Sequence, residues 1–434
     1  MLSIAFLLGI GEQGKAQIYT LKECLEIGLQ NNYSLRIVHN EEQISKNNAT
    51  LGNAGYLPTV DFTAGYTGNL DNTKTTSRST GTSTIDKHVF DQTANVGVNL
   101  NWTLFDGFNI STTYERLKEL ARQGETQTRI AVEDYIASVA AEYYNFIQQK
   151  IRLENYRYAM KLSRERLRIA GDNLAVGKFS GLEYQLAQVD FNTDSTQYLK
   201  QKELLQTSLI RLNELMANKD ANNVVVIRDS TINVHYHLNQ KELWEAMLTT
   251  NASLLQADQN TNLAMLDYKK VCSRNYPYLK LNTGYGYTFN KYDINATSKR
   301  GNLGLNAGIT LGFNIFDGNR RREKRNASLN IQNRRLEKQD LELTLRSNFA
   351  DLWQAYKNNL QVLELERQNL PTAKENHDVA QDRYKLGDIS GFEMREIQKT
   401  LIDAEERIIT AEYNTKLCEI SLLQISGTIM QYLK

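Results

Sequence analysis

Residues 304–318, GLNAGITLGFNIFDG, alternate apolar and small polar side chains. The apolar side chains occupy every second position, at Leu305, Ala307, Ile309, Leu311, Phe313 and Ile315. A period of two places them on one face of a β-strand and the Gly, Asn and Thr residues on the other. No charged residue interrupts the alternation before Asp317. A soluble sandwich strand usually carries Lys, Glu or Arg on its solvent face, so we interpret 303–315 as a membrane strand with a lipid-facing and a lumen-facing side.

Other segments of the chain are predicted to be strands of the same kind. Residues 94–104, ANVGVNLNWTL, repeat the alternation and also run into the tripeptide Phe-Asp-Gly. Residues 60–68 and 279–290 are predicted strands as well; in the latter we expect lipid contact from Leu279, Leu281, Tyr285, Tyr287 and Phe289, with Lys280 and Asn282 inside. Each segment has about the 9–11 residues with which a tilted strand crosses a bilayer. Residues 69–88 are rich in Ser, Thr and Asn and are predicted to form an exposed loop.

Composition narrows the class of protein. The 434 residues carry 51 Lys and Arg against 50 Asp and Glu, so a net charge of +1 indicates neither nucleic acid nor an acidic substrate as partner. Only 3 prolines occur, which favours long uninterrupted helices. Cys24, Cys272 and Cys418 lie far apart without a Cys-x-x-Cys pair, so they predict neither a disulfide framework nor a metal site. The apolar run LSIAFLLGI near the start is typical of a secretory signal, and we predict a signal peptide over 1–17.

The chain is internally duplicated. Four pairs of motifs recur in the same order at intervals of 210 to 219 residues: Asn32 and Asn251, Pro58 and Pro277, Phe-Asp-Gly at 105–107 and 316–318, and VGKFSGLE at 176–183 and LGDISGFE at 386–393. Ordered matches at a nearly constant spacing indicate a repeat. We therefore predict two copies of helix, strand, strand, long helix, turn and helix, over 18–217 and 241–434, joined by an irregular segment at 218–240.

The helical segments combine heptad spacing with great length. Apolar or small residues step by four and three along the last helix, at Ile397, Leu401, Ala404, Ile408, Ala411, Thr415, Cys418, Leu422 and Ile425, and similarly at Val132, Ile136, Val139, Tyr143 and Phe146. Residues 319–386 would measure on the order of 100 Å as one helix at 1.5 Å per residue, too long for an ordinary globular core. Residues 21–52 are predicted to form another helix.

Four strands cannot close a membrane barrel, whose lower limit is about eight strands. Open strand edges are excluded from lipid because each unpaired backbone group costs several kcal/mol. The chain must therefore associate with further copies. The alternative is a soluble or surface coiled-coil scaffold with β-hairpin insertions and no transport function. A hydrolase is disfavoured because His235 and His237 have no nearby Cys to complete a metal site and no nucleophile and base pair is evident.

These motifs together resemble the TolC-like outer-membrane efflux proteins over nearly the whole chain after residue 17. The resemblance implies a homotrimer, with a twelve-stranded β-barrel in the outer membrane of a Gram-negative bacterium and a long α-helical barrel in the periplasm. It implies a passive exit duct of a tripartite efflux or type I secretion system, which contacts outer-membrane lipid and receives substrate from an inner-membrane transporter through a periplasmic adaptor (membrane fusion) protein. No catalytic centre, cofactor, metal or nucleic acid is implied.

The turns at 176–183 and 386–393 are the candidate functional elements. Gly177 and Gly387 suit helix C-termini, because glycine accepts left-handed backbone angles. The spacing of capping boxes is present twice, in Ser180 with Glu183 and in Ser390 with Glu393. The resemblance implies that these helix reversals close the periplasmic end and touch the adaptor, with four contact candidates: Gly177, Lys178, Gly387 and Asp388.

The resemblance also implies an acidic ring and a gate tyrosine at the entrance, which match Glu393, Glu396 and Tyr384. For Glu393, helix capping is an equal alternative, whereas Glu396 has no capping role and corresponds to Leu186 in the first half. Six carboxylates around a narrow mouth would repel one another and attract cations.

A run of basic residues follows the fourth strand, at Arg320, Arg321, Arg322, Lys324 and Arg325. No basic domain surrounds it, so we expect the inner headgroup boundary of the membrane or a solvated helix start rather than a nucleic-acid patch. Asp106 and Asp317 of the Phe-Asp-Gly junctions are predicted to form turns and cap helices.

Overall fold

The computed structural model describes residues 18–223, 225–294 and 297–433, so the predicted signal peptide lies outside the described residues. The first half contains β1 (Ile18–Tyr19), α1 (Leu21–Asn31), α2 (Tyr33–Asn48), α3 (Leu51–Ala54), β2 (Thr59–Thr76), β3 (Ser83–Asp106), α4 (Asn109–Ala175) and α5 (Gly181–Leu215). The second half contains β4 (Val226–Ile227), α6 (Gln240–Thr250), α7 (Ala252–Ser273), β5 (Tyr278–Lys291), β6 (Lys299–Gly312), α8 (Arg320–Leu386), α9 (Gly391–Ile425) and a short 3₁₀ helix, η1 (Ile429–Leu433). The same order of paired strands and long helices in both halves confirms the duplicated fold.

The chain forms two compact units that cut across the sequence repeat. Of the described residues, the helical unit contains those within Met1–Glu41, Thr126–Gln256 and Lys338–Lys434, and the sheet unit contains those within Glu42–Glu125 and Ala257–Glu337. Each unit therefore takes residues from both halves. A repeat of this kind cannot bury its own apolar faces alone, so each half is completed by the other.

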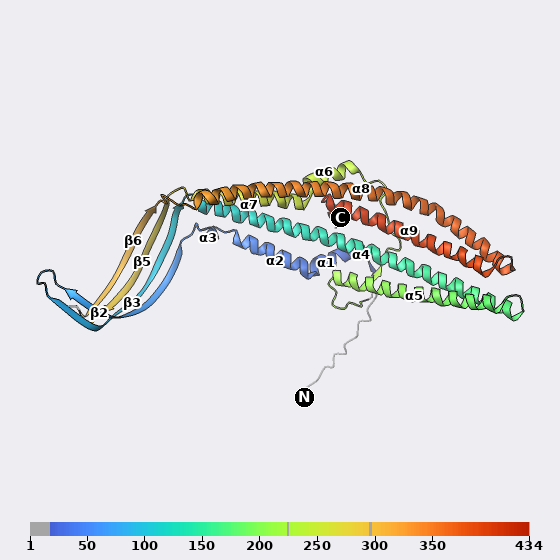
Figure 1. Cartoon of the computed structure of the whole chain (residues 1–434), viewed down its shortest axis with the longest axis horizontal. Helices are drawn as coiled ribbons and strands as arrows, with labels where there is room; N and C mark the ends of the chain where they lie inside the picture. Colours follow the sequence, from blue (N-terminus) through green and yellow to red (C-terminus); the bar gives the residue numbers. More distant parts are fainter. Residues whose placement is uncertain (1–17, 224, 295–296, 434) are drawn as a thin grey trace, which may run out of the picture. The chain divides into compact units, whose positions relative to one another are not determined.

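The sheet unit contains one antiparallel sheet in the order β2-β3-β5-β6 (Figure 1). One row of partners across its four strands is apolar, with Phe62, Val98, Tyr285 and Leu305. The adjacent row, on the opposite face, is small and polar, with Thr63, Gly97, Gly286 and Gly304. The register therefore aligns the alternation of all four strands into two distinct faces.

The apolar face of this sheet is uncovered in the single chain. Phe62 is 71%, Tyr285 56% and Leu305 74% exposed. In a soluble core such side chains would be buried, because their exposure to water is unfavourable by about 25 cal/mol per Å². The face assignment predicted for Leu279, Leu281 and their neighbours agrees with the register, since Leu281 pairs with Ile309 on the same side.

The first two strands extend beyond their predicted boundaries. The loop expected over 69–88 is wrong for most of its length, because β2 runs on to Thr76 and β3 already begins at Ser83. Threonine is β-branched and favours extended backbone, so a polar composition did not prevent strand formation here.

The fourth strand, expected over 303–315, instead ends at Gly312, the partner of Tyr278 at the start of β5. The residue before Tyr278 is Pro277, which has no N–H with which to continue the ladder.

The helices of the sheet unit follow the order of its strands. Lys46 of α2 pairs with Glu125 of α4 at 3.0 Å. Arg116 of α4 pairs with Asp267 of α7 at 2.7 Å. At the other side, the ammonium of Lys324 in α8 lies 5.8 Å from the ring centroid of Tyr268 in α7. The order α2-α4-α7-α8 thus leaves α2 and α8 at the outside, beneath the edge strands β2 and β6.

The core of the helical unit lies where α1, α4, α5, α8 and α9 meet the short parallel pair β1 and β4. Five residues of the predicted heptad seams are buried in this core: Ile136, Val139, Tyr143, Phe146 and Leu422. Four others are buried elsewhere along α9: Leu401, Ala404, Ala411 and Thr415. Within residues 18–223, 225–294 and 297–433, no helix combines the length and the hydropathy that crossing a membrane requires.

The single helix predicted over 21–52 is wrong, because Asn32 separates α1 from α2. Its side-chain oxygen accepts from the Ser34 and Leu35 amides at 3.0 and 3.3 Å, and its Nδ2 donates to the Leu215 carbonyl at 3.2 Å. Asn251 does the same in the second half, accepting from two amides at 3.0 and 3.1 Å and donating to the Ile425 carbonyl at 2.8 Å. Each asparagine therefore starts one helix and ties it to the end of another.

Candidate functional site

The two helix reversals of the helical unit have the same backbone geometry. Gly177 and Gly387 have φ values of +73° and +86°, in the left-handed region that disfavours side chains. The next amide in each turn reaches back to a carbonyl five residues earlier, from Lys178 to Asn173 at 2.9 Å and from Asp388 to Arg383 at 3.0 Å. These bonds terminate α4 and α8 in the same way. Lys178 and Asp388 are exposed at the two turns.

Both reversals also contain a capping box. The Glu183 amide donates to the Ser180 hydroxyl at 3.3 Å, and the Ser180 amide donates to the Glu183 carboxylate at 3.0 Å. In the second tip the corresponding distances between Ser390 and Glu393 are 3.2 and 3.0 Å. The Glu393 carboxylate is thus engaged in capping α9, and its part in a gate remains a prediction.

A cavity of about 500 Å³ lies between α5 and α9 next to these tips, within the helical unit. Tyr384 and Glu396 both line it, together with Glu183 and Phe179. Tyr384 is buried, and its ring centroid lies 6.1 Å from that of Phe179. Burial raises the pKa of the Tyr384 phenol, so it stays protonated at physiological pH. The structure therefore brings two of the three gate candidates to one cavity, whereas Glu393 caps the helix beside it.

An ion-pair network that the sequence analysis missed joins three helices at this cavity. Arg395 of α9 donates to both carboxylate oxygens of Asp194 in α5, at 2.7 and 2.9 Å. Asp190, one turn before Asp194, lies 3.6 Å from the Arg395 Nε and pairs with Arg166 of α4. The hydroxyl of Ser163 donates to Asp194 as well. We name this group of five residues the tip network.

Burial affects the two arginines of the tip network differently. Desolvation lowers the pKa of the Arg166 guanidinium, and Asp190 opposes this shift. Desolvation is also the largest single influence on Arg395 and disfavours its charge, but the hydrogen bonds to Asp194 and the charges of nearby carboxylates together outweigh it, so the pKa of Arg395 is raised. Charge-assisted bidentate pairs are among the strongest hydrogen bonds in proteins. Arg395 and Asp194 therefore form a direct bidentate link between α5 and α9 at the tip.

A sequence signal for the tip network does exist. Ala187, Asp194, Gln201 and Ser208 follow one another at heptad spacing on α5, and all four are buried. A polar residue at a seam position has to find partners across the seam, since an unpaired buried polar group is costly. The heptad spacing shows which positions share a face, but the sequence alone does not show that this face of α5 is the buried one. Asp190 and Asp194 therefore look like solvent-facing charges until the structure is known.

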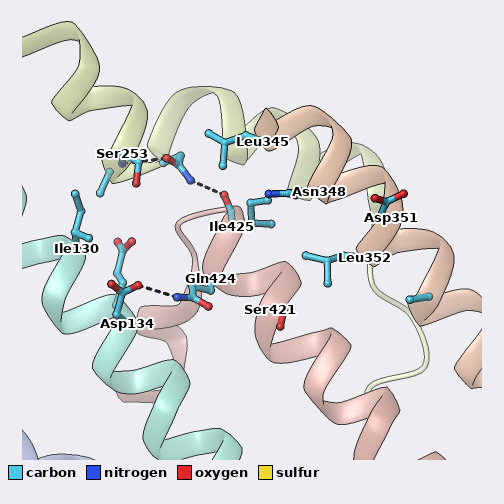
Figure 2. Close-up of a pocket in the computed structure, with 14 residues that line it drawn as sticks. Ile130, Asp134, Ser253, Leu345, Asn348, Asp351, Leu352, Ser421, Gln424 and Ile425 are labelled. Carbon is cyan, nitrogen blue, oxygen red and sulfur yellow. Dashed lines mark hydrogen bonds between the residues drawn. The ribbon is translucent and has the colours of Figure 1, made fainter. Parts of the chain in front are cut away.

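A second cavity of the helical unit, of about 600 Å³, lies among α4, α7, α8 and α9. Figure 2 shows Asp134 facing Gln424, whose Nε2 donates to the Asp134 carboxylate at 2.8 Å. Ser253 and Ser421 line this cavity without any histidine to act as a base. Its polar groups connect helices of both halves, as the contact between Asp134 and Gln424 does.

The exposed His235 side chain contacts a buried carboxylate of α9. Its Nδ1 lies 2.7 Å from the buried Glu419 carboxylate, which also accepts from Lys416 at 2.7 Å and from Tyr432 at 3.2 Å. In the part of the chain that the structure describes, no group of three or more His, Cys, Asp or Glu is placed to hold a metal ion. This cluster fastens the segment before α6 and η1 to α9.

Comparisons with known proteins give a consistent result. A family model described as outer membrane efflux protein matches residues 25–218 and 243–428. The outer membrane protein TolC of Vibrio cholerae is 22% identical over 394 residues, which cover 88% of this chain and 84% of that protein. A membrane protein from Pseudomonas aeruginosa has the same fold, with a TM-score of 0.79 and 17% identity over 94% of this chain and 90% of its own. The CmeC outer membrane channel of Campylobacter jejuni has a TM-score of 0.76 and 18% identity over 94% and 85%.

The fold and these matches define an outer membrane channel of Gram-negative bacteria. The chain belongs to the outer membrane efflux protein family, since the family model covers most of its length. This is a non-enzymatic family of trimeric channels that work in tripartite efflux systems. The family resemblance inferred from the sequence is confirmed, and the alternative of a non-transporting scaffold is set aside.

Proposed function

We propose that three copies of this chain close a twelve-stranded barrel and act as the passive exit duct of an efflux or secretion system. An inner-membrane transporter supplies the energy, and a periplasmic adaptor protein docks on the capped tips at Gly177, Lys178, Gly387 and Asp388. The helices project into the periplasm. The duct opens by separation of α5 from α9 at the tip network, beside Tyr384 and Glu396.

The observation that carries the trimer is the open sheet. β2 and β6 are the edges of the sheet, and each leaves one row of backbone groups unpaired. In β6, with 14 residues, about seven residues point their N–H and C=O groups outward. Each such group costs several kcal/mol in lipid, so the exposed apolar face can lie in a membrane only if the edges are paired with other copies.

The helices beneath the edges support the same closure. Ile37 and Ile44 of α2 are exposed and seven residues apart, and so are Leu329 and Leu336 of α8. Exposed apolar residues at heptad spacing fit a coiled-coil seam with another helix. α2 and α8 flank the sheet unit on opposite sides. The exposed apolar residues of α8 in one copy can therefore pack against those of α2 in the next copy.

Two arginine substitutions on opposite faces of β6 test this proposal. Leu305→Arg places a charge on the lipid face, where an arginine near the bilayer centre costs about 2–4 kcal/mol per chain. Asn306→Arg, the matched control, places the same charge on the lumen face. We expect Leu305→Arg to abolish outer-membrane trimer and single-channel conductance, and Asn306→Arg to keep the trimer while changing ion selectivity. Equal tolerance of both substitutions would refute the two-faced barrel.

A further inference from the structure

A separate cavity of about 550 Å³ lies within the sheet unit where the strands meet the helices. Lys270 and Arg274, at the end of α7, contribute two of its positive charges, and Lys280 of β5 contributes a third. Thr103 and Asn314 line it as well. We name it the basal cavity.

The basal cavity has more positive charge than its own carboxylates neutralise. Its single acidic lining residue, Asp106, is engaged by the Ile110 amide at 3.0 Å and the Asn109 Nδ2 at 2.9 Å. Arg274 pairs with Glu323 of α8 at 2.5 Å. For Lys270 and Lys280, the described residues include no carboxylate at ion-pair distance.

The local structure explains only part of this excess. A lysine in the last turn of a helix is favoured by the helix dipole, which accounts for Lys270. Lys280 lies 5.2 Å above the ring centroid of Tyr278, a contact that orients the ammonium without neutralising it. Lys270 and Lys280 are both exposed and line the same concavity, so a polyvalent anion bound there would interact with two positive charges at once.

The basal cavity belongs to the small polar face of the sheet. Lys280 pairs across the strands with Thr103, and both share a face with the neighbouring pair Asn282 and Asn101, two residues along. Under the function proposed above this face lines the lumen. Three copies would then form a ring of at least six surplus positive charges at the base of the barrel, on the path of every exported molecule.

We propose that the basal cavity is a binding site for polyvalent oxyanions of the phosphate type, held by Lys280 and Lys270 with hydroxyl and amide donors from the cavity wall. The inference rests on the proposed trimeric duct. With such a site, the channel either prefers cargo that carries a phosphate or sulfonate group or is inhibited by such solutes from the external side.

Inorganic pyrophosphate is a suitable probe for single-channel recordings in bilayers of zwitterionic phosphatidylcholine. We expect saturable block of the wild-type current, with the blocking constant weakened about tenfold in Lys280→Gln, as for the loss of one charge-assisted contact. Lys270→Gln should act similarly. Lys269→Gln is the matched control, because Lys269 neighbours Lys270 on α7 and does not line the cavity.

Titration calorimetry of the same proteins in uncharged detergent gives a readout that needs no channel. Binding of pyrophosphate that Lys280→Gln weakens and Lys269→Gln leaves intact supports the site. A conducting wild-type channel without block and without calorimetric binding overturns the site and leaves the duct standing. An equal loss in Lys269→Gln overturns it too, since general charge would then explain the effect. If pyrophosphate binds in a lysine-dependent way but the protein never conducts, the proposed duct is contradicted and the binding site stands.

Discussion

Replacement of Arg395 by methionine should shift the tip toward its open state, in which α5 and α9 are separated. The change keeps an unbranched, flexible side chain but removes the guanidinium and with it both hydrogen bonds to Asp194, whose side chain is only 8% exposed. An uncompensated buried carboxylate costs about 3–5 kcal/mol. Because Ser163 still donates to Asp194 and the Arg395 side chain is itself 20% exposed, we take the lower value of about 3 kcal/mol.

This cost falls only on the state in which α5 and α9 are in contact. At about 1.4 kcal/mol per factor of ten, the ratio of open to closed tips should rise by about two orders of magnitude. Single-channel recording measures this directly as open probability. Arg395→Lys should give a smaller change, since lysine keeps the charge but cannot form the bidentate pair.

Arg407→Met is the matched control on the same helix, because its Nε pairs with Glu366 at 3.0 Å outside the tip network and its side chain is 49% exposed. We expect a change of less than about threefold there, as is usual for an exposed ion pair. The reasoning is refuted if Arg395→Met forms intact trimers with wild-type open probability, or if Arg407→Met opens the channel to the same extent.

Three further predictions concern Glu396, Asn251 and the cysteines. Glu396→Gln should lower cation selectivity and cation block, and an unchanged reversal potential in a salt gradient would remove Glu396 from the entrance. Asn251→Ala should lower the free energy of unfolding by about 1–2 kcal/mol, because it loses a helix cap and an anchor to α9; an unaltered thermal midpoint would contradict this. Burial raises the pKa of the Cys24 thiol to about 12. The folded state is therefore stabilised by the protonated thiol. This stabilisation is fully present below the pKa of a free thiol, about 8.5, and is lost as the pH rises toward 12. At pH 9 iodoacetamide should therefore modify Cys272 well before Cys24, as peptide mass spectrometry would show; equal rates would disprove the burial.

The two faces of the sheet were predictable because they depend on local alternation alone. A period of two fixes which side chains share a face, whatever the partner strand is. The ends of the strands depend on partners distant in sequence. β6 ends at Gly312 because Pro277 stops the facing strand, although Phe313 and Ile315 continue the alternation.

The tip shows the same division between local and distant causes. The glycine and the capping box of each turn lie within eight consecutive residues, so both turns could be recognised from the sequence. The tip network depends on which face of α5 is buried and on a partner in α9 some 200 residues away, at Arg395. Asn32 likewise looks like an ordinary helical residue until its distant acceptor, the Leu215 carbonyl, is known.

The central claim is that one chain is an incomplete pore. Light scattering coupled to size-exclusion chromatography of the detergent-solubilised protein measures the protein mass of the particle. We predict three copies per particle, each somewhat below the 49.7 kDa of the full chain once the predicted signal peptide is removed, in a particle that separates into single chains only on heating. A monodisperse single chain that stays in solution without detergent would contradict the account.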